Sequence, residues 1–100
     1  MNYAVKFPNK RLEKQFEKTL NSISKKNLKK HIIEALEGLA SNPRPEGKIF
    51  KTLRPPIELY HFTAQYRLRI GDYRILYDVN ETTQSVWIFA LRKRDESTYR

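Results

Sequence analysis

The sequence has no cysteine, only three glycines and one tryptophan, and few acidic residues. The lack of cysteine excludes disulfides, thiolate metal sites and a cysteine nucleophile. The longest uninterrupted apolar run, Val86 to Leu91, has six residues, whereas a membrane-spanning helix needs about 20. The N-terminal residues contain no apolar segment typical of a secretory signal. We therefore expect a soluble protein of the cytoplasm that does not associate with a membrane.

The length and composition predict one globular domain. With 100 residues, the chain falls within the usual domain size of about 50–200 residues, so we assign residues 1–100 to a single domain. Hydrophobic residues make up 39% and charged residues 31% of the sequence, which is typical of a folded chain. Because a dinucleotide-binding sheet with its partner domain would not fit in this length, we predict no cofactor.

The charge of the chain is strongly unbalanced. Twenty basic and eleven acidic residues give a net charge of +9, which favours a nucleic acid or another anionic partner. Residues 1–50 contain nine Lys and two Arg, whereas residues 51–100 contain two Lys and seven Arg. A guanidinium group holds a phosphate through two hydrogen bonds, while a lysine acts as a hydrated point charge. The second half of the chain is therefore the better candidate for binding phosphates.

The first half of the sequence has the pattern of a strand followed by two helices. Residues 4–7 are a strand candidate, and Asn9 can cap the helix that follows. Apolar residues at helical spacing predict helices over residues 10–20 and 25–40, the second capped by Ser24. Because their connection is short, we expect an antiparallel helical hairpin. The segment after it, residues 41–56, contains four of the five prolines and is expected to be an irregular surface linker.

The second half of the sequence changes to the two-residue alternation that is typical of β-strands. Apolar and polar residues alternate over residues 60–70 and 73–79, and the apolar run 86–91 predicts a further, buried strand. We therefore predict an α+β domain. It consists of an N-terminal strand, a two-helix antiparallel hairpin, and a mainly antiparallel sheet of three to four strands that packs on the helices.

Gly-Asp at residues 71–72 separates the two alternating runs and suits a two-residue hairpin turn. In that register Arg69 lies opposite Arg74, and both share with Arg67 the sheet face that points away from the helices. Like charges in direct opposition destabilise a hairpin, so this pair indicates a functional site. The next strand returns antiparallel and brings the basic residues 92–94 to the same end. The pattern predicts a basic surface for a nucleic-acid backbone.

The segment YRLRIGDYRILY, residues 66–77, resembles the core signature of the RelE/ParE toxin superfamily. The segment LASNPRPEG, residues 39–47, and the basic run before Tyr99 agree with this resemblance, which covers nearly the whole chain. For the RelE branch, it implies an endoribonuclease that cuts messenger RNA in the ribosomal A site and is inhibited by an antitoxin. For the ParE branch, it implies a protein that poisons DNA gyrase. We expect RelE-like activity, with the antitoxin, messenger RNA and the ribosome as partners.

Metal-independent RNA cleavage uses the 2′-hydroxyl as the nucleophile. It needs a base for that hydroxyl, an acid for the leaving 5′-oxygen, and positive charge around the phosphorane. The sequence shows no Asp, Glu or His cluster with the spacing of metal ligands, so we expect no metal. The two histidines, His31 and His61, do not form an acid–base pair, and we interpret both as ordinary surface residues.

The resemblance places the site on arginines. It implies that Arg74 and Arg94 stabilise the phosphate and the charge of the transition state, while Arg67 and Arg69 position the backbone. Tyr99 matches the C-terminal tyrosine of the family, which acts as a base or stacks on a nucleobase. Further RNA contacts are assigned to four basic residues, Arg92, Lys93, Lys51 and Arg54.

Two alternative functions belong to different classes. A ParE-like gyrase inhibitor would bind a protein and do no chemistry. A non-catalytic RNA-binding member of the family is suggested by Asp95 and Glu96, which interrupt the basic tail.

Overall fold

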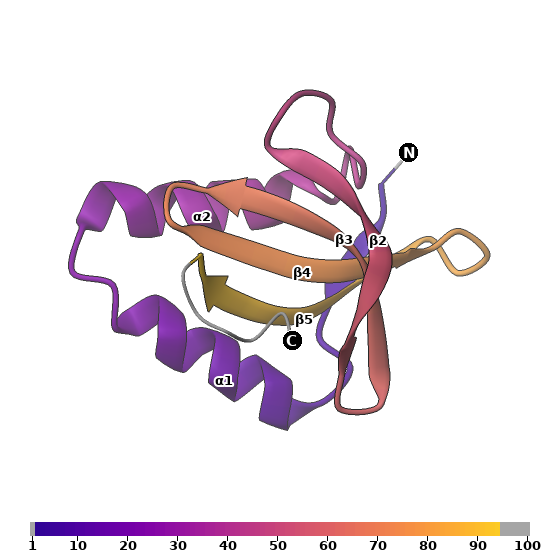
Figure 1. Cartoon of the computed structure of the whole chain (residues 1–100), viewed down its shortest axis with the longest axis horizontal. Helices are drawn as coiled ribbons and strands as arrows, with labels where there is room; N and C mark the ends of the chain where they lie inside the picture. The colour runs from indigo at the N-terminus through magenta and orange to yellow at the C-terminus, as the bar shows by residue number, and fades with distance from the viewer. Residues whose placement is uncertain (1, 95–100) are drawn as a thin grey trace.

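The computed structural model describes residues 2–94 and confirms the α+β class (Figure 1). The elements follow in the order β1 (Ala4–Lys6), α1 (Lys10–Asn21), α2 (Lys26–Gly38), β2 (Phe50–Leu59), β3 (Phe62–Ile70), β4 (Tyr73–Asn80) and β5 (Ser85–Lys93). Over residues 2–94, no helix combines the length and the apolar character needed to cross a membrane.

Both helices form where the apolar spacing predicted them. The side-chain oxygen of Asn9 accepts a hydrogen bond from the backbone N–H of Leu12 at 2.9 Å, which confirms the predicted cap of α1. Helix α2 begins after Lys25, which makes no capping side-chain hydrogen bond, so the prediction of Ser24 as its cap was wrong. The two helices run in opposite directions, with α1 packed along β5 and α2 against β3 (Figure 1).

The five strands form one sheet in the order β1-β5-β4-β3-β2. Strands β2 to β5 pair antiparallel with their neighbours, and β1 joins the edge of the sheet parallel to β5. The predicted register of the β3–β4 hairpin is confirmed, because Leu68 lies opposite Ile75 and Arg69 opposite Arg74. Gly71 occupies the turn with a φ of 58°, a conformation that glycine adopts without steric cost.

The proline-rich segment is the main difference from the prediction. Residues 41–49 are irregular, but residues 50–59 form β2 at the edge of the sheet, which therefore has five strands. The register between β2 and β3 shifts between Thr52 and Ile57, where the two adjacent prolines lie. Proline cannot donate a hydrogen bond to a sheet, but it is tolerated in edge strands and bulges. The prolines thus interrupted the alternation by which sequence analysis detects a strand.

Two hydrophobic clusters lie on opposite sides of the sheet. The larger one joins the helices to the sheet and includes Phe16, Ile32, Leu68, Ile75 and Tyr77. The smaller one occupies part of the face that points away from α2, here called the outer face, and contains Leu12, Leu59, Ala64, Leu76, Phe89 and Ala90. Helix α1 contributes to both clusters. The outer face is therefore apolar near the middle of the sheet, and the arginines of β3, β4 and β5 on this face lie towards the 71–72 turn.

Candidate nucleic-acid interface

Three arginines lie in register across three neighbouring strands of the outer face. Arg69 of β3 is directly opposite Arg74 of β4, and Arg74 is directly opposite Arg92 of β5. All three residues are partly exposed. Neighbouring strands are about 4.8 Å apart, so this arginine row places three positive charges on a strip roughly 10 Å wide at the backbone.

A second row lies one step further from the turn. Lys51 of β2 is opposite Arg67 of β3, which is opposite Leu76 of β4. A guanidinium nitrogen of Arg67 donates a hydrogen bond to the carbonyl oxygen of Ile49 at 3.0 Å. Between the rows, a hollow of about 230 Å³ is lined by Lys51, Leu53, Arg67 and Arg74. The two rows form the basic surface that the alternation predicted, and we call it the arginine face (Lys51, Arg67, Arg69, Arg74 and Arg92).

The end of β5 reaches the β3–β4 turn, as predicted. The backbone N–H of Arg94 donates to the carbonyl oxygen of Asp72 at 2.5 Å, and a guanidinium nitrogen of Arg74 donates to the carbonyl oxygen of Arg94 at 3.4 Å. Lys93 is opposite Tyr73, whose ring packs against the helix-side cluster. Because cross-strand partners share a face, the structure places Lys93 on the side of the sheet away from the arginine row.

Arg54 lies beside this face rather than within either row. It is exposed and lines a neighbouring hollow of about 430 Å³ next to the irregular part of β2, and Lys51 and Leu53 line both hollows. Tyr99 lies outside the described residues. Both histidines are exposed, His31 on α2 and His61 at the turn between β2 and β3. In the part of the chain from residue 2 to residue 94, no three histidine or carboxylate side chains form a group that could hold a metal ion.

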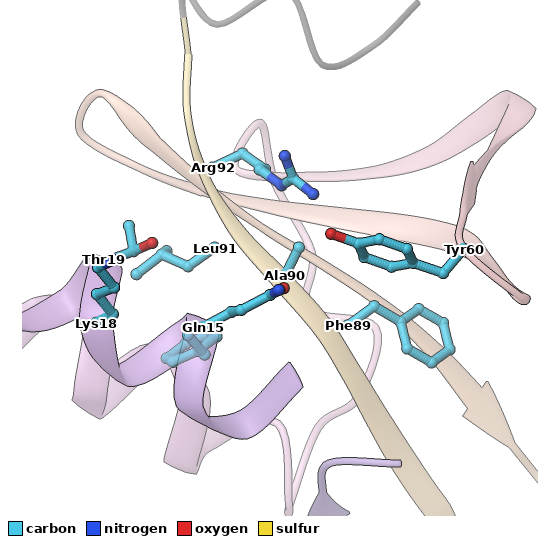
Figure 2. Close-up of a pocket in the computed structure, with 9 residues that line it drawn as sticks. Gln15, Lys18, Thr19, Tyr60, Phe89, Ala90, Leu91 and Arg92 are labelled. Carbon is cyan, nitrogen blue, oxygen red and sulfur yellow. The ribbon is translucent and has the colours of Figure 1, made fainter. Parts of the chain in front are cut away.

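A further hollow of about 260 Å³ lies between α1 and β5, at the end of the arginine row (Figure 2). Arg92 and Tyr60 point toward one another across it, and its helical wall is formed by Gln15, Lys18 and Thr19. Tyr60 is 58% exposed and has a φ of 60°, which is uncommon for a residue that carries a β-carbon. The alternation placed Tyr60 inside a strand, so sequence analysis missed its position at this hollow.

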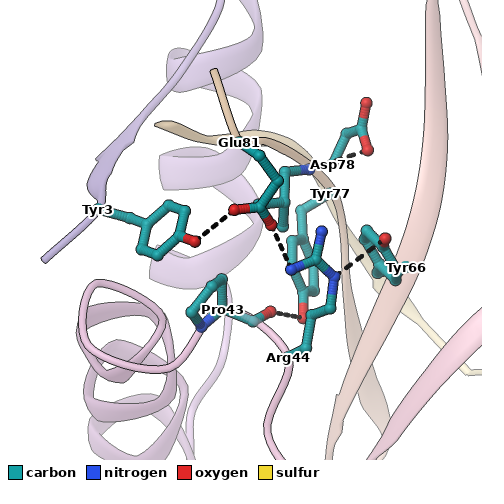
Figure 3. A network of polar contacts seen from close by, with 8 residues as sticks. Tyr3, Pro43, Arg44, Tyr66, Tyr77, Asp78 and Glu81 are labelled. Carbon is teal, nitrogen blue, oxygen red and sulfur yellow. Dashed lines mark hydrogen bonds and ion pairs between the residues drawn. The ribbon is translucent and has the colours of Figure 1, made fainter. Parts of the chain in front are cut away.

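A polar network that was not predicted from the sequence fixes the loop before β2 (Figure 3). Arg44 on this loop forms an ion pair with Glu81 and donates from Nε to the hydroxyl of Tyr66 at 3.1 Å. The hydroxyl of Tyr3 donates to the carboxylate of Glu81 at 2.5 Å. Tyr66 also stacks on Phe50, with 5.5 Å between the ring centroids. The network thereby holds the start of β2 against the strand that carries the arginines.

Hydrogen bonds and burial set the charges in this network. The hydrogen bond from Tyr3, followed by that from Arg44, holds the pKa of Glu81 below its usual range. The hydrogen bond to Glu81 raises the pKa of Tyr3. Tyr77 donates its hydroxyl to the carbonyl oxygen of Pro43 at 2.7 Å, and burial raises the pKa of Tyr77. Near neutral pH, Glu81 is thus ionised and both tyrosines are neutral.

Comparison with known proteins places the chain in a family. Residues 9–98 match the family model described as the ParE toxin of the type II toxin–antitoxin system, parDE. The chain belongs to the RelE/ParE toxin family. It is therefore a toxin of a type II toxin–antitoxin system. The curated proteins include no significant match.

Three solved structures of this family have a similar fold. The archaeal RelE–RelB complex from Pyrococcus horikoshii is 30% identical, with a TM-score of 0.71 over 97% of this chain and 100% of that one. The toxin–antitoxin complex RelBE2 from Mycobacterium tuberculosis is 20% identical, with a TM-score of 0.60 over 94% of this chain and 100% of that one. A double-arginine mutant of Escherichia coli RelE in the free state is 20% identical, with a TM-score of 0.56 over 97% of this chain and 88% of that one. At 20% sequence identity, the last two structures support only the similarity of the fold.

Proposed function

We propose that this toxin is a ribosome-dependent messenger RNA endonuclease. The observation that carries the proposal is the arginine face, where Lys51, Arg67 and Arg74 line a hollow on the side of the sheet that α2 leaves open. Arg69 and Arg92 flank Arg74 in the sheet. Like charges directly opposite each other in a sheet lower the stability of the fold. The arginine row contains two such pairs, Arg69 with Arg74 and Arg74 with Arg92. A surface that holds a polyanion through its phosphates offsets this cost, because each bound phosphate neutralises part of the repulsion.

In the proposed reaction, the 2′-oxygen of a nucleotide forms a bond to the adjoining phosphorus, and the bond from that phosphorus to the 5′-oxygen breaks. The products are a 2′,3′-cyclic phosphate and a free 5′-hydroxyl. A base removes the proton of the 2′-hydroxyl, and an acid protonates the leaving 5′-oxygen. An arginine stays protonated in proteins, so its role is to stabilise the charge that develops on the phosphorane.

The roles of the individual residues follow from this chemistry and from the resemblance to the family. We assign Arg74 and Arg94 to the charge on the phosphorane, and Arg67 and Arg69 to positioning of the RNA backbone. Support comes from the hydrogen bond between the Arg74 side chain and the Arg94 carbonyl oxygen, because it brings these two residues together beside the turn. The assignment of Tyr99 as a base or stacking residue is kept as part of the proposal.

We also propose a cognate antitoxin as the protein partner. The relatives from Pyrococcus horikoshii and Mycobacterium tuberculosis are toxin–antitoxin complexes, and a chain with a net charge of +9 favours an acidic partner. Coexpression with the protein encoded beside this one, followed by copurification, tests this partner.

The endonuclease is tested in a cell-free translation system with a defined message. The purified toxin is expected to arrest translation, and mapping of the message ends should find cuts in the ribosomal A site. Arg74→Ala should reduce cleavage at least about a hundredfold, the typical loss when one charge-stabilising group is removed. Lys30→Ala is the charge-matched control, because Lys30 is exposed on α2, away from the arginine face. Full cleavage by a folded Arg74→Ala variant would contradict the proposal.

The chemistry has a separate test on the same ribosomes. A message with a 2′-deoxynucleotide at the cleavage site should resist the toxin, and cleaved messages should carry a cyclic phosphate. Cleavage of the deoxy-substituted message would exclude 2′-hydroxyl attack.

Gyrase inhibition is the second candidate, because the matching family model carries the ParE description. A DNA supercoiling assay separates the two activities. Inhibited gyrase together with normal translation would favour the ParE-like function over the endonuclease.

A further inference from the structure

An apolar pocket of about 360 Å³ lies on the outer face, beyond the Leu76 end of the arginine face. We call it the aromatic pocket; it is lined by Pro8, His61, Phe62, Thr63, Asp78, Trp87 and Phe89. It forms because the tip of the β2–β3 hairpin bends toward the start of α1 (Figure 1), where Arg11 lies 5.7 Å from the ring centroid of Tyr60. None of the roles proposed above uses this pocket.

The walls of the aromatic pocket are flat rings. The rings of Phe62 and Phe89 stack with their centroids 5.1 Å apart and an angle of 20° between their planes. Trp87 lies opposite Asp78 in the sheet and is partly exposed. The ammonium group of Lys6 lies 4.9 Å from the centroid of the Trp87 ring. An aromatic surface with a cation beside it is suited to stacking a nucleobase that is attached to a phosphate.

Two polar groups of the pocket, the carboxylate of Asp78 and the hydroxyl oxygen of Thr63, can accept a hydrogen bond from a ligand, while His61 can donate or accept one. One carboxylate oxygen of Asp78 accepts from the backbone N–H of Val79 at 2.8 Å, and the group points away from Arg44 (Figure 3). The hydroxyl of Thr63 donates to the carboxylate of Glu58 at 3.1 Å, which leaves its oxygen as an acceptor. A carboxylate at the base edge selects a nucleobase that carries an exocyclic amino group.

We propose that the aromatic pocket binds an amino-bearing nucleobase of the RNA strand whose phosphates lie on the arginine face. The inference rests on the proposed RNA substrate. Asp78 and Arg74 share β4 and its outer face and are four residues apart, which corresponds to about 13 Å. A short run of single-stranded nucleotides spans this distance. The carboxylate of Asp78 repels a phosphate, so the phosphates lie at the arginine end and the base at the aromatic end.

The sequence provides its own reporter for this pocket, because Trp87 is the only tryptophan of the chain. Titration of the purified toxin with tetracytidylate should quench the Trp87 fluorescence to saturation. An abasic tetramer of the same charge should bind without quenching. Tetrauridylate should bind roughly 5- to 100-fold more weakly than tetracytidylate, because uracil carries a carbonyl where cytosine carries the amino group. These measurements need neither ribosomes nor cleavage.

Three variants make the test specific. Asp78→Asn should abolish the preference for cytosine, because an amide serves as donor and acceptor alike. Phe62→Leu keeps an apolar wall but removes one ring. It should weaken the binding of tetracytidylate roughly 5- to 100-fold, the range found when one stacking partner is lost. The binding of the abasic tetramer should not change. His61→Ala, which removes a side chain that lines the pocket, should also weaken the binding of tetracytidylate. The matched control is His31→Ala, an exposed histidine on α2.

The outcomes separate this inference from the proposed cleavage. Equal binding of tetracytidylate and the abasic tetramer without quenching overturns the nucleobase pocket, even if the toxin cleaves messages. Quenching by a copurified antitoxin but not by RNA also overturns it and assigns the pocket to a protein side chain. If RNA quenches the fluorescence in a base-dependent way but the toxin leaves translation intact, the result supports the nucleobase pocket and contradicts the proposed endonuclease activity.

Discussion

The arginine row predicts that removing positive charge stabilises the fold. Arg69 and Arg92 each lie directly opposite Arg74, and one like-charge contact across strands costs about 0.2–1 kcal/mol. Arg69→Gln and Arg92→Gln each remove one contact and keep most of the side-chain stem. Both substitutions act on the same partner, Arg74, and each removes its own pairwise repulsion with it, so the double variant removes both repulsions. The double variant should gain about 0.4–2 kcal/mol in the free energy of unfolding.

Urea unfolding followed by Trp87 fluorescence measures this gain, which corresponds to an increase in Tm of about 4–8 °C per kcal/mol for a domain of this size. Salt provides an internal check, because the screening length is about 10 Å at 0.1 M salt and about 3 Å at 1 M. The second length is shorter than the spacing of the strands, so the gain should largely disappear at high salt. Arg69→Lys, which keeps the charge, and Arg54→Gln, which lies outside the row, should show no comparable gain. A destabilised double variant at low salt, or a gain that is unaffected by salt, would refute the reasoning.

Three further predictions concern the fold. Gly71→Ala should lower the free energy of unfolding by about 1–2 kcal/mol in a urea titration, because φ is 58° and a β-carbon would lie 2.9 Å from a side-chain carbon of Leu28; an unchanged midpoint would contradict this. Glu81→Gln should weaken the loss of stability at acid pH. The pKa of Glu81 is lowered in the folded state, so Glu81 contributes stability above its unfolded pKa, and this contribution is lost as the pH falls through the folded pKa. An unchanged dependence of stability on acid pH would exclude this role. Tyr77→Phe should lower the free energy of unfolding by about 1–3 kcal/mol, because it leaves the Pro43 carbonyl oxygen without its partner. The pKa of Tyr77 is raised in the folded state, so the stability that Tyr77 contributes is present below its unfolded pKa of about 10 and is lost at higher pH; Tyr77→Phe should reduce this loss. Thermal unfolding at several alkaline pH values checks both effects.

The β3–β4 hairpin could be predicted in register from the sequence alone. Its two-residue turn and the alternation favour one pairing, which places the apolar residues other than Leu76 on the face that packs against the helices. This pairing puts Arg69 opposite Arg74. The position of the basic end of β5 followed from the same reasoning, because an antiparallel return has to end near the turn.

Other features depend on contacts that local patterns do not contain. Strand β2 was missed because its prolines lie at a register shift of an edge strand, where pairing with β3 tolerates them. The Arg44 network joins residues that are far apart in the sequence, and no spacing rule connects Tyr3 with Glu81. Lys93 was grouped with Arg92 by charge, although the alternation of a strand places neighbouring side chains on opposite faces.

The pairing of β1 with β5 has a consequence for synthesis of the toxin. Strand β1 has its sheet partner in β5, so the sheet of the described residues is complete only when residues 85–93 have emerged from the ribosome. A chain that stops before β5 lacks Arg92 and leaves β1 and β4 with unsatisfied backbone groups along one edge. Such fragments should aggregate or be degraded. The topology therefore delays assembly of the arginine face until β5 has emerged from the ribosome.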